Sequence, residues 1–142
     1  MHSLAIALKE NGHEVTGSDD AIFDPSLTQL QKAEICPEPM GWFPEKITKG
    51  LDAVILGMHA KKDNPELLAT QKMELPIFSY PEFIAHYARH KTRVVIGGSH
   101  GKTTISAMVL HVLNYHQKSV DYMIGAQLEG FENSVHLSDN ND

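Results

Sequence analysis

Gly97-Gly98-Ser99-His100-Gly101-Lys102-Thr103-Thr104 is the stretch of this sequence that decides the fold. It follows one apolar run, 93–96, and precedes a longer one, 105–113. This order predicts a strand, a glycine-rich turn and a helix. A helix that begins after such a turn directs unpaired backbone N–H groups and the positive end of its dipole at the turn. The stretch therefore predicts a loop that binds phosphate.

The residue types in this loop fit the chemistry of a nucleotide phosphate. Gly98 and Gly101 allow the backbone to approach the phosphate closely, Lys102 adds a mobile positive charge, and the Thr103 hydroxyl is a ligand for Mg²⁺. The common phosphate-loop pattern has another glycine five residues before Gly101, where this chain has Ile96. The loop is therefore a shorter variant, and the alternative is a glycine turn that precedes Lys-Thr by chance.

Length, composition and charge limit the class of protein. The chain has 142 residues, of which 42% are hydrophobic and 21% charged, which is typical of one globular domain or two incomplete ones. The net charge of −6 does not favour a nucleic-acid surface, and no apolar run is long enough to span a bilayer. No signal peptide is visible, and the single cysteine, Cys36, suits a reducing compartment. We expect a cytoplasmic protein whose partners include neither nucleic acid nor membrane.

Helices and strands are expected to alternate along the chain. Apolar runs bounded by charges or glycines predict buried strands, and capping residues followed by proline or glutamate predict helix starts. The expected helices cover 4–11, 26–33, 64–73, 79–90 and 105–113, and the expected strands cover 13–19, 34–36, 52–57, 76–78, 93–96 and 120–125. This alternation predicts an α/β fold with a Rossmann-like parallel sheet, followed by the start of a phosphate-loop α/β domain, with the boundary at 90–93.

The first expected helix has no strand before it. In a nucleotide-binding βαβ unit a strand and a glycine turn would precede this helix, so we expect the Rossmann-like sheet to lack its first strand. Asp19 stands where such a fold places an acid at the end of its second strand, in contact with a ribose hydroxyl. The alternative for Ser18-Asp19-Asp20 is a solvated turn, and the sequence does not separate the two.

Several segments together resemble one family. The loop at 98–104 is similar to the short phosphate loop of the Mur ligases, the ATP-dependent amide-forming enzymes of peptidoglycan synthesis, and this resemblance accounts for Ile96. Segments 12–19, 63–66 and 122–126 also resemble that family, although Ala126 stands where the family usually has a glycine. Gly57-Met58-His59-Ala60 departs from the branch that adds L-alanine and favours the branch that adds a preformed tripeptide. Both branches stay open.

The resemblance implies two incomplete domains and an enzymatic reaction. Residues 1–90 would form a UDP-sugar-binding domain without its start, and residues 91–142 would form the start of the ATP-binding domain. The parent enzyme would join UDP-N-acetylmuramate to L-alanine or to the L-Ala-γ-D-Glu-meso-diaminopimelate tripeptide through an acyl phosphate, with ATP and Mg²⁺. This chain alone is expected to be inactive, and its oligomeric state stays open.

The resemblance also assigns roles to individual residues. Lys102 would contact the β- and γ-phosphates, Thr103 would ligate Mg²⁺, and His100 would face the lactyl or phosphate side of the substrate. The ATP-binding residues would be Gly98, Ser99, His100, Gly101, Lys102, Thr103 and Thr104. The UDP-sugar pocket would be lined by Asp19, His59 and Asn64.

Two other functions compete with the ligase. A kinase or another phosphate-loop NTPase would need arginines after the loop to bind its acceptor, and residues 102–142 contain none. A nucleotide-binding module without turnover is compatible with every motif described above. His86 and His90 share a helix face, but Tyr87 follows His86 where a zinc hydrolase has glutamate, so a zinc site is disfavoured.

Overall fold

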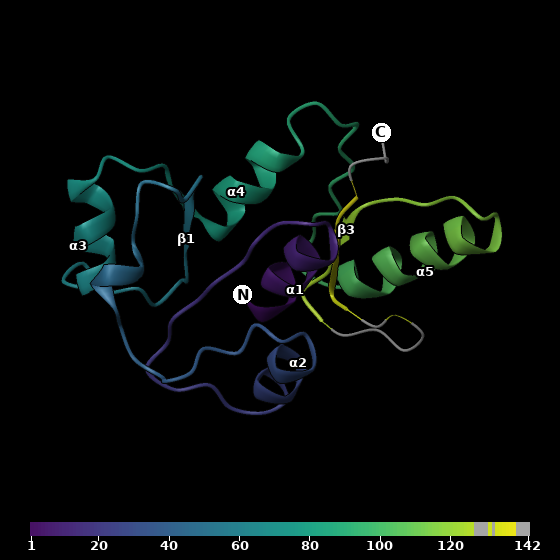
Figure 1. Ribbon diagram of the computed structural model, residues 1–142. Helices are drawn as coiled ribbons and strands as arrows, with labels where there is room; N and C mark the ends of the chain where they lie inside the picture. Colours follow the sequence, from purple (N-terminus) through teal and green to yellow (C-terminus); the bar gives the residue numbers. More distant parts are fainter. Residues whose placement is uncertain (127–130, 132, 139–142) are drawn as a thin grey trace. The chain divides into compact units, whose positions relative to one another are not determined.

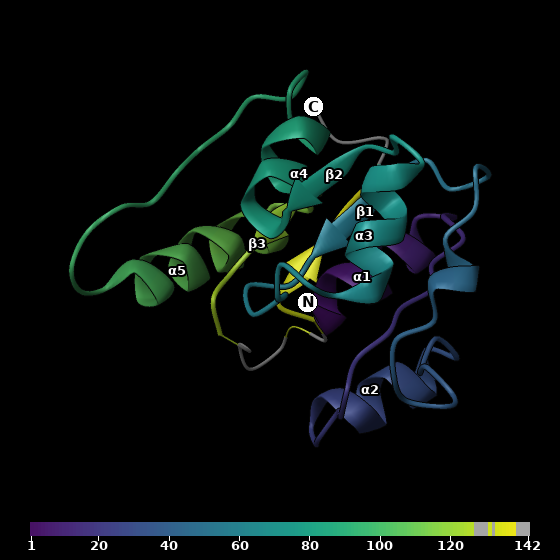
Figure 2. The same ribbon diagram turned by 90° about the vertical axis from the view of Figure 1, so that its left-hand side faces the viewer.

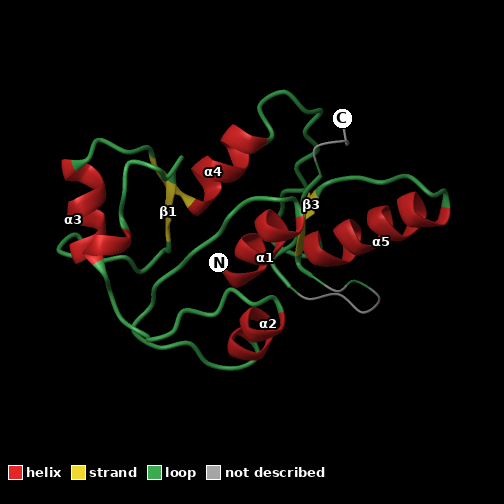
Figure 3. Ribbon diagram, in the orientation of Figure 1, coloured by secondary structure: helices red, strands yellow, loops and turns green. Residues whose placement is uncertain are grey.

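The structure is a computed structural model that describes residues 1–126, 131 and 133–138. The chain forms two compact units: Thr16–Arg89 together with Met1, and His2–Val15 together with His90–Asp142. Helices and strands alternate through much of the chain (Figure 3), so the described part has a mixed α/β fold. No helix in this part is long and apolar enough to cross a membrane. The assignment of 1–90 and 91–142 to a UDP-sugar and an ATP domain stays a prediction.

The first unit is built around two parallel strands, β1 (Val54–Leu56) and β2 (Ile77–Ser79). Ile55 pairs with Phe78 at the centre of this short ladder. The connection between the strands contains α3 (Pro65–Lys72), and α4 (Tyr80–Tyr87) packs against both strands. The expected strands at 52–57 and 76–78 are therefore confirmed, and they form a small parallel sheet.

The starts of α3 and α4 are the capped helix starts that the sequence predicts. The Asn64 side-chain oxygen accepts hydrogen bonds from the N–H groups of Glu66 and Leu67, at 2.9 and 3.1 Å. Ser79 and Glu82 form a capping box, in which each side chain accepts from the other residue's backbone N–H. A cap of this kind typically stabilises a helix by about 1 kcal/mol.

The rest of the first unit contains α2 (Ser26–Lys32) and a short 3-10 helix, η1 (Pro44–Lys46), which packs against α3. The Phe43 N–H donates to the Glu66 side chain at 2.7 Å, which ties the start of η1 to the first turn of α3. The buried residues of this unit are Leu30, Pro37, Ile47, Leu67 and Thr70.

The second unit combines the first helix of the chain with its last strands (Figure 1). It contains α1 (His2–Glu10), α5 (Lys102–Tyr115), β3 (Tyr122–Met123) and β4 (Val135–His136). β3 and β4 are antiparallel, with Met123 opposite Val135, and α1 packs against β4. The sequence did not predict β4.

The contact between α1 and β4 is apolar at its centre and polar at its edges. Leu4 and Val135 are each only 1% exposed. The Ser134 hydroxyl donates to the Ser3 hydroxyl at 2.9 Å, and the Asn133 side chain donates to Glu10 at 3.5 Å. Segments from the two ends of the chain therefore share one core.

Three expected strands are not formed. Residues 13–19 and 34–36 lack strand structure, apart from a single antiparallel bridge between Asp19 and Gly41. Residues 93–96 are also without a strand, and Val94 and Val95 are 82% and 88% exposed. A strand exists only when a neighbour accepts its hydrogen bonds. No strand of the described residues pairs with 93–96, so the expected strand before the phosphate loop is wrong for this structure.

Candidate functional site

The predicted phosphate loop lies directly before α5, in the second unit. Gly98 and Gly101 have φ angles of +145° and +76°, a region that side chains disfavour because the Cβ crowds the backbone. Gly101 is also the residue that caps the amino-terminal end of α5. The backbone of the loop therefore requires glycine at both positions, whatever it binds.

The amino-terminal end of α5 has no side-chain cap. Its first helical hydrogen bond runs from the Ile105 N–H to the Gly101 carbonyl, at 2.9 Å. The N–H groups at 102–104 precede that bond and carry the partial positive charge of the helix end. Such a group of amides is suited to an anion, phosphate in particular.

Lys102 adds a full positive charge at the same place. Its ammonium donates to the carbonyl oxygens of Gly98 and Ser99, at 2.6 and 3.3 Å, so the side chain lies back over the loop. His100 Nδ1 is 3.2 Å from the Ser99 hydroxyl. All of these side chains are exposed, so the charge is accessible to a ligand. The donor set of the loop fits the phosphates of ATP.

The loop fits Mg²⁺ only in part. Thr103 and Thr104 are exposed at the start of α5, and the Thr103 hydroxyl is an oxygen ligand of the kind that Mg²⁺ prefers. Within the described ranges, no group of three or more His, Cys, Asp or Glu side chains is arranged to hold a metal ion. A Mg²⁺ bound at Thr103 would also take oxygen ligands from the phosphates or from water.

The predicted UDP-sugar residues lie in the first unit. His59 is exposed in the turn at 57–60 that follows the carboxyl end of β1, and Asn64 caps the helix after that turn. The carboxyl ends of parallel strands are the usual ligand-binding edge of such sheets. Asp19 is exposed, its carbonyl accepts from the Gly41 N–H and its carboxylate accepts from the Asp20 N–H, both at 2.8 Å. Contact of these three residues with a UDP-sugar stays a prediction.

Three side chains of the first unit have shifted pKa values. Hydrogen bonds from Thr28 lower the pKa of Asp24, and hydrogen bonds from Ser79 lower the pKa of Glu82. Burial raises the pKa of Tyr80. The shifts of Asp24 and Glu82 therefore report hydrogen bonds at the starts of α2 and α4, whereas the shift of Tyr80 reports burial.

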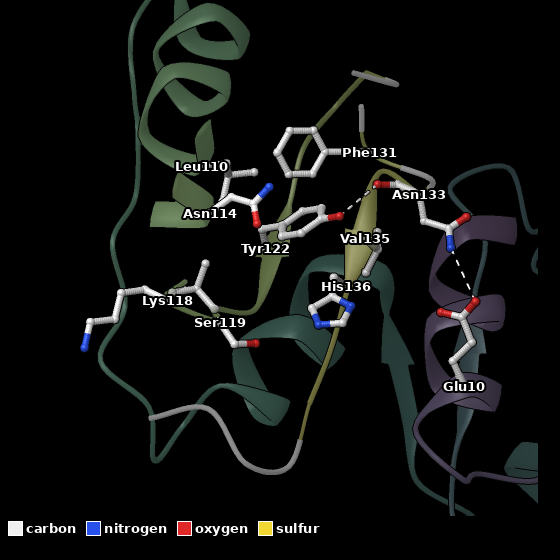
Figure 4. Close-up of a pocket in the computed structure, with 11 residues that line it drawn as sticks. Glu10, Leu110, Asn114, Lys118, Ser119, Tyr122, Phe131, Asn133, Val135 and His136 are labelled. Atoms are coloured by element: carbon white, nitrogen blue, oxygen red, sulfur yellow. Dashed lines mark hydrogen bonds between the residues drawn. The ribbon is translucent and has the colours of Figure 1, made fainter. Parts of the chain in front are cut away.

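A pocket of about 440 Å³ lies beside the carboxyl-terminal half of α5, and none of its lining residues was predicted from the sequence (Figure 4). The Tyr122 hydroxyl donates to the Asn133 carbonyl across it, at 3.4 Å. Asn114, which also lines the pocket, lies about 18 Å along the helix axis from Lys102 at about 1.5 Å per residue. The lining combines one carboxylate, one ammonium and one imidazole with uncharged polar and apolar side chains, so it selects no single ligand chemistry.

Comparison with known proteins assigns the chain to a class and then to a family. An α/β protein with a glycine-rich turn before an uncapped helix is typical of nucleotide-binding proteins. The family model described as the Mur ligase family, catalytic domain, matches residues 1–92, which is more than half of the chain. The chain belongs to the Mur ligase family.

Two curated relatives represent the two expected branches. The UDP-N-acetylmuramate–L-alanyl-γ-D-glutamyl-meso-2,6-diaminoheptandioate ligase of Escherichia coli is 31% identical over 140 residues, which cover 98% of this chain and 30% of the relative. The UDP-N-acetylmuramate–L-alanine ligase of Carboxydothermus hydrogenoformans is 32% identical over 113 residues, which cover 80% of this chain and 24% of the relative. The chain thus spans about a quarter to a third of these relatives.

Two solved structures share the fold. The tripeptide ligase of Neisseria meningitides has a TM-score of 0.80 and 31% identity, over 96% of this chain and 43% of that one. The murein peptide ligase of Psychrobacter arcticus has a TM-score of 0.80 and 28% identity, over the whole of this chain and 32% of that one. The resemblance to Mur ligases is thereby confirmed in sequence and in fold.

Proposed function

We propose that this chain supplies the ATP-phosphate loop and the UDP-sugar region of an ATP-dependent Mur-type ligase. The start of α5 is the observation that carries the proposal. Gly101 begins the helix without a side-chain cap, and the Lys102 ammonium lies over the same loop, 2.6 Å from the Gly98 carbonyl. Uncapped amides and a mobile cation at one point are what a triphosphate needs. We assign 91–142 to the ATP region and 1–90 to the UDP-sugar region.

The reaction proposed for the whole ligase forms an amide in two steps. A carboxylate oxygen of UDP-N-acetylmuramate attacks the γ-phosphorus of ATP, ADP leaves, and an acyl phosphate results. The amine nitrogen then attacks the acyl carbon, loses a proton, and inorganic phosphate leaves. In this scheme Lys102 and the α5 amides offset the charge on the phosphates, the Thr103 hydroxyl ligates Mg²⁺, and His100 faces the reacting groups. The amine is L-alanine or the tripeptide, the substrates named for the two curated relatives.

The UDP-sugar region is proposed to use the residues at the carboxyl edge of β1. His59 is exposed there, and Asn64 has its side-chain oxygen engaged by the cap of α3. Asn64 would therefore reach a ligand through its amide nitrogen. Asp19 would contact the ribose. We also propose a cytoplasmic location, because a lone cysteine, Cys36, suits a reducing compartment.

A second candidate function is nucleotide binding without turnover. It is favoured by the start of α5, where uncapped amides and Lys102 are suited to bind phosphate whether or not the phosphate is then transferred. One assay distinguishes ligase activity from nucleotide binding without turnover. Incubation with ATP, Mg²⁺, UDP-N-acetylmuramate and either amine is expected to release no phosphate from this chain alone. Release above the background of a Lys102→Ala variant would show that the chain turns over by itself.

A nucleotide titration tests the loop itself. We expect Mg²⁺·ATP to bind weakly, and Lys102→Ala to weaken binding about tenfold or more, because a hydrogen bond to a charged group contributes about 1.5–3 kcal/mol. Lys118→Ala is the matched control, since Lys118 is exposed beyond the other end of α5. Isothermal titration calorimetry gives both affinities. Equal affinity for the wild type and Lys102→Ala would remove the phosphate-loop assignment.

A further inference from the structure

Two loop segments of the first unit are joined by one backbone and one side-chain hydrogen bond. The Gly41 N–H donates to the Asp19 carbonyl at 2.8 Å, which forms an isolated antiparallel bridge. Beside this bridge, the Trp42 indole N–H donates to the Asp20 carboxylate. A hydrogen bond to an ionised acceptor is stronger than one between neutral groups, so the side-chain bond reinforces the backbone bridge.

These bonds also hold the carboxylate of Asp19, the residue proposed to contact the ribose. Asp19 Oδ1 accepts from the Asp20 N–H at 2.8 Å, so the direction of the carboxylate depends on the position of Asp20. Trp42 holds Asp20 in turn through the indole bond. An exposed aspartate without such bonds samples several rotamers, and this freedom is lost when a ligand binds.

Phe43, the next residue, ties the same segment to the start of α3. Its N–H donates to Glu66 Oε1 at 2.7 Å, and the Glu66 N–H donates to the Asn64 side chain at 2.9 Å. Figure 2 shows the chain between α2 and β1, in which η1 follows Phe43 and lies next to α3. Residues 41–43 therefore connect Asp19 to Asn64, both of which are proposed to line the UDP-sugar pocket.

Gly41 is the position at which this segment is least able to accept a side chain. Its φ is +129°, and a Cβ placed there would lie 3.4 Å from the Phe43 ring. Residues other than glycine rarely adopt this φ. A side chain at Gly41 would therefore strain the backbone that donates to Asp19.

We infer that residues 41–43 form a brace for the UDP-sugar site, with Trp42 as the positioning residue for the Asp19 carboxylate. The inference rests on the proposed function of the first unit, because it assigns the brace to the ligand site proposed there. In this role Trp42 acts through Asp20 rather than by touching the ligand. The brace lowers the cost of ordering Asp19 when the ribose binds, so loss of the brace weakens binding.

The indole bond can be tested without a ligand, because Trp42 is the only tryptophan of the chain. Its indole N–H gives a single cross-peak in a nitrogen–proton NMR spectrum. Asp20→Ala should shift this cross-peak and speed exchange of the indole proton with solvent, since the acceptor is lost. Asp52→Ala is the matched control, because Asp52 is also exposed in the first unit. A cross-peak that Asp20→Ala leaves unchanged would overturn the inference.

Titration of the wild-type chain and its variants with UDP-N-acetylmuramate tests the positioning role. Trp42→Phe keeps an aromatic ring without the N–H donor and should weaken binding about fivefold. Trp42→His keeps a ring N–H and should retain most of the affinity. Gly41→Ala should also weaken binding, and Gly50→Ala is its matched control, because a Cβ at Gly50 meets only the Thr48 hydroxyl, at 3.7 Å. Isothermal titration calorimetry gives the affinities, and circular dichroism shows whether each variant folds.

A double-mutant cycle separates a positioning role from a general structural one. In an Asp19→Ala background, Trp42→Phe should have no further effect on affinity, because the carboxylate that Trp42 positions is gone. If Asp19→Ala binds too weakly to measure, the comparison of Trp42→Phe with Trp42→His decides.

Three binding results would overturn the inference. They are equal affinity of Trp42→Phe and the wild type, equal losses in Trp42→Phe and Trp42→His, and the same loss from Trp42→Phe with and without Asp19. Each of these requires that the wild type binds the sugar nucleotide. A wild type that does not bind it would remove the proposed UDP-sugar function and the role of the brace together, so the two failures are distinguishable.

Discussion

The α-helices α3 and α5 begin in opposite ways, both in the conformation and in the chemistry of the capping residue. In α3, the Asn64 side chain accepts two of the first-turn N–H groups at 2.9 and 3.1 Å. In α5, Gly101 offers no side chain, and the nearest cation is Lys102, hydrogen-bonded to the loop. In a capped helix start the side chain already accepts hydrogen bonds from the first-turn N–H groups. In an uncapped start beside an ammonium, these N–H groups can instead bind an anion. The difference separates a helix start that stabilises the fold from one that is suited to a ligand.

The two units also differ in whether their apolar extended segments have partner strands. β1 and β2 pair with each other through Val54–Ile77, Ile55–Phe78 and Leu56–Ser79, and α4 covers both strands. Residues 93–96 have a similar apolar sequence but no partner strand in the described part of the chain. The first unit thus contains the neighbours that its elements require, and the phosphate-loop segment does not.

Substitution of Gly101 should lower the stability of the protein more than removal of the α3 cap or acidification. Gly101→Ala forces a side chain to adopt a φ of +76°, which should lower the free energy of unfolding by about 1–2 kcal/mol. Gly97→Ala is the matched control, because a Cβ at Gly97 meets nothing within 4 Å. Its effect should stay within about 0.5 kcal/mol. Urea denaturation followed by circular dichroism measures both. Equal losses would show that Gly101 is not held in the left-handed region.

Removal of the α3 cap should have the next largest effect. Asn64→Ala leaves the Glu66 and Leu67 N–H groups without their acceptor, which should cost about 1 kcal/mol. Asn64→Asp keeps an acceptor oxygen and adds a charge that favours the helix end, so it should retain stability. The same urea titration distinguishes the two variants. A loss of equal size in both would mean that Asn64 acts through something other than the cap.

The parts of the structure that the sequence predicts are those set by local chemistry. Asn64, Ser79 with Glu82, and Gly101 mark helix starts through bonds to residues two to four positions away, so each could be recognised without the rest of the chain. The apolar runs that became β1 and β2 were also recognisable, because each is continuous and bounded by turn residues.

The parts that the sequence does not predict depend on distant partners. The strand expected at 93–96 needs neighbours that no local pattern supplies. Val135 is 1% exposed because α1 packs on β4, a contact between residues more than 100 positions apart in sequence. In the candidate site, the chemistry of Lys102 was predictable from its motif, but its bonds to the Gly98 and Ser99 carbonyls depend on the loop conformation.

Acidification should have the smallest effect, and it should act on the capped helix starts. The Glu82 carboxylate accepts from the Ser79 N–H and hydroxyl, at 2.8 and 2.6 Å, and these bonds lower its pKa. A pKa that is lower in the folded state means stability that is present above the ordinary glutamate pKa and lost as pH falls through the folded value. Asp24, whose pKa Thr28 lowers, has the same sign.

Glu82→Gln isolates this contribution, because glutamine keeps the shape of the side chain and removes the charge. Wild type should be the more stable at pH 7, and the difference should be smaller at pH 3, which lies below the ordinary glutamate pKa of about 4. Urea titrations at both pH values measure the difference, and Asp24→Asn provides the same comparison at the start of α2. The start of α5 has no carboxylate cap, so acid should leave its stability unaffected by this route. A difference between wild type and Glu82→Gln that is as large at pH 3 as at pH 7 would mean that the capping box does not depend on the ionised carboxylate.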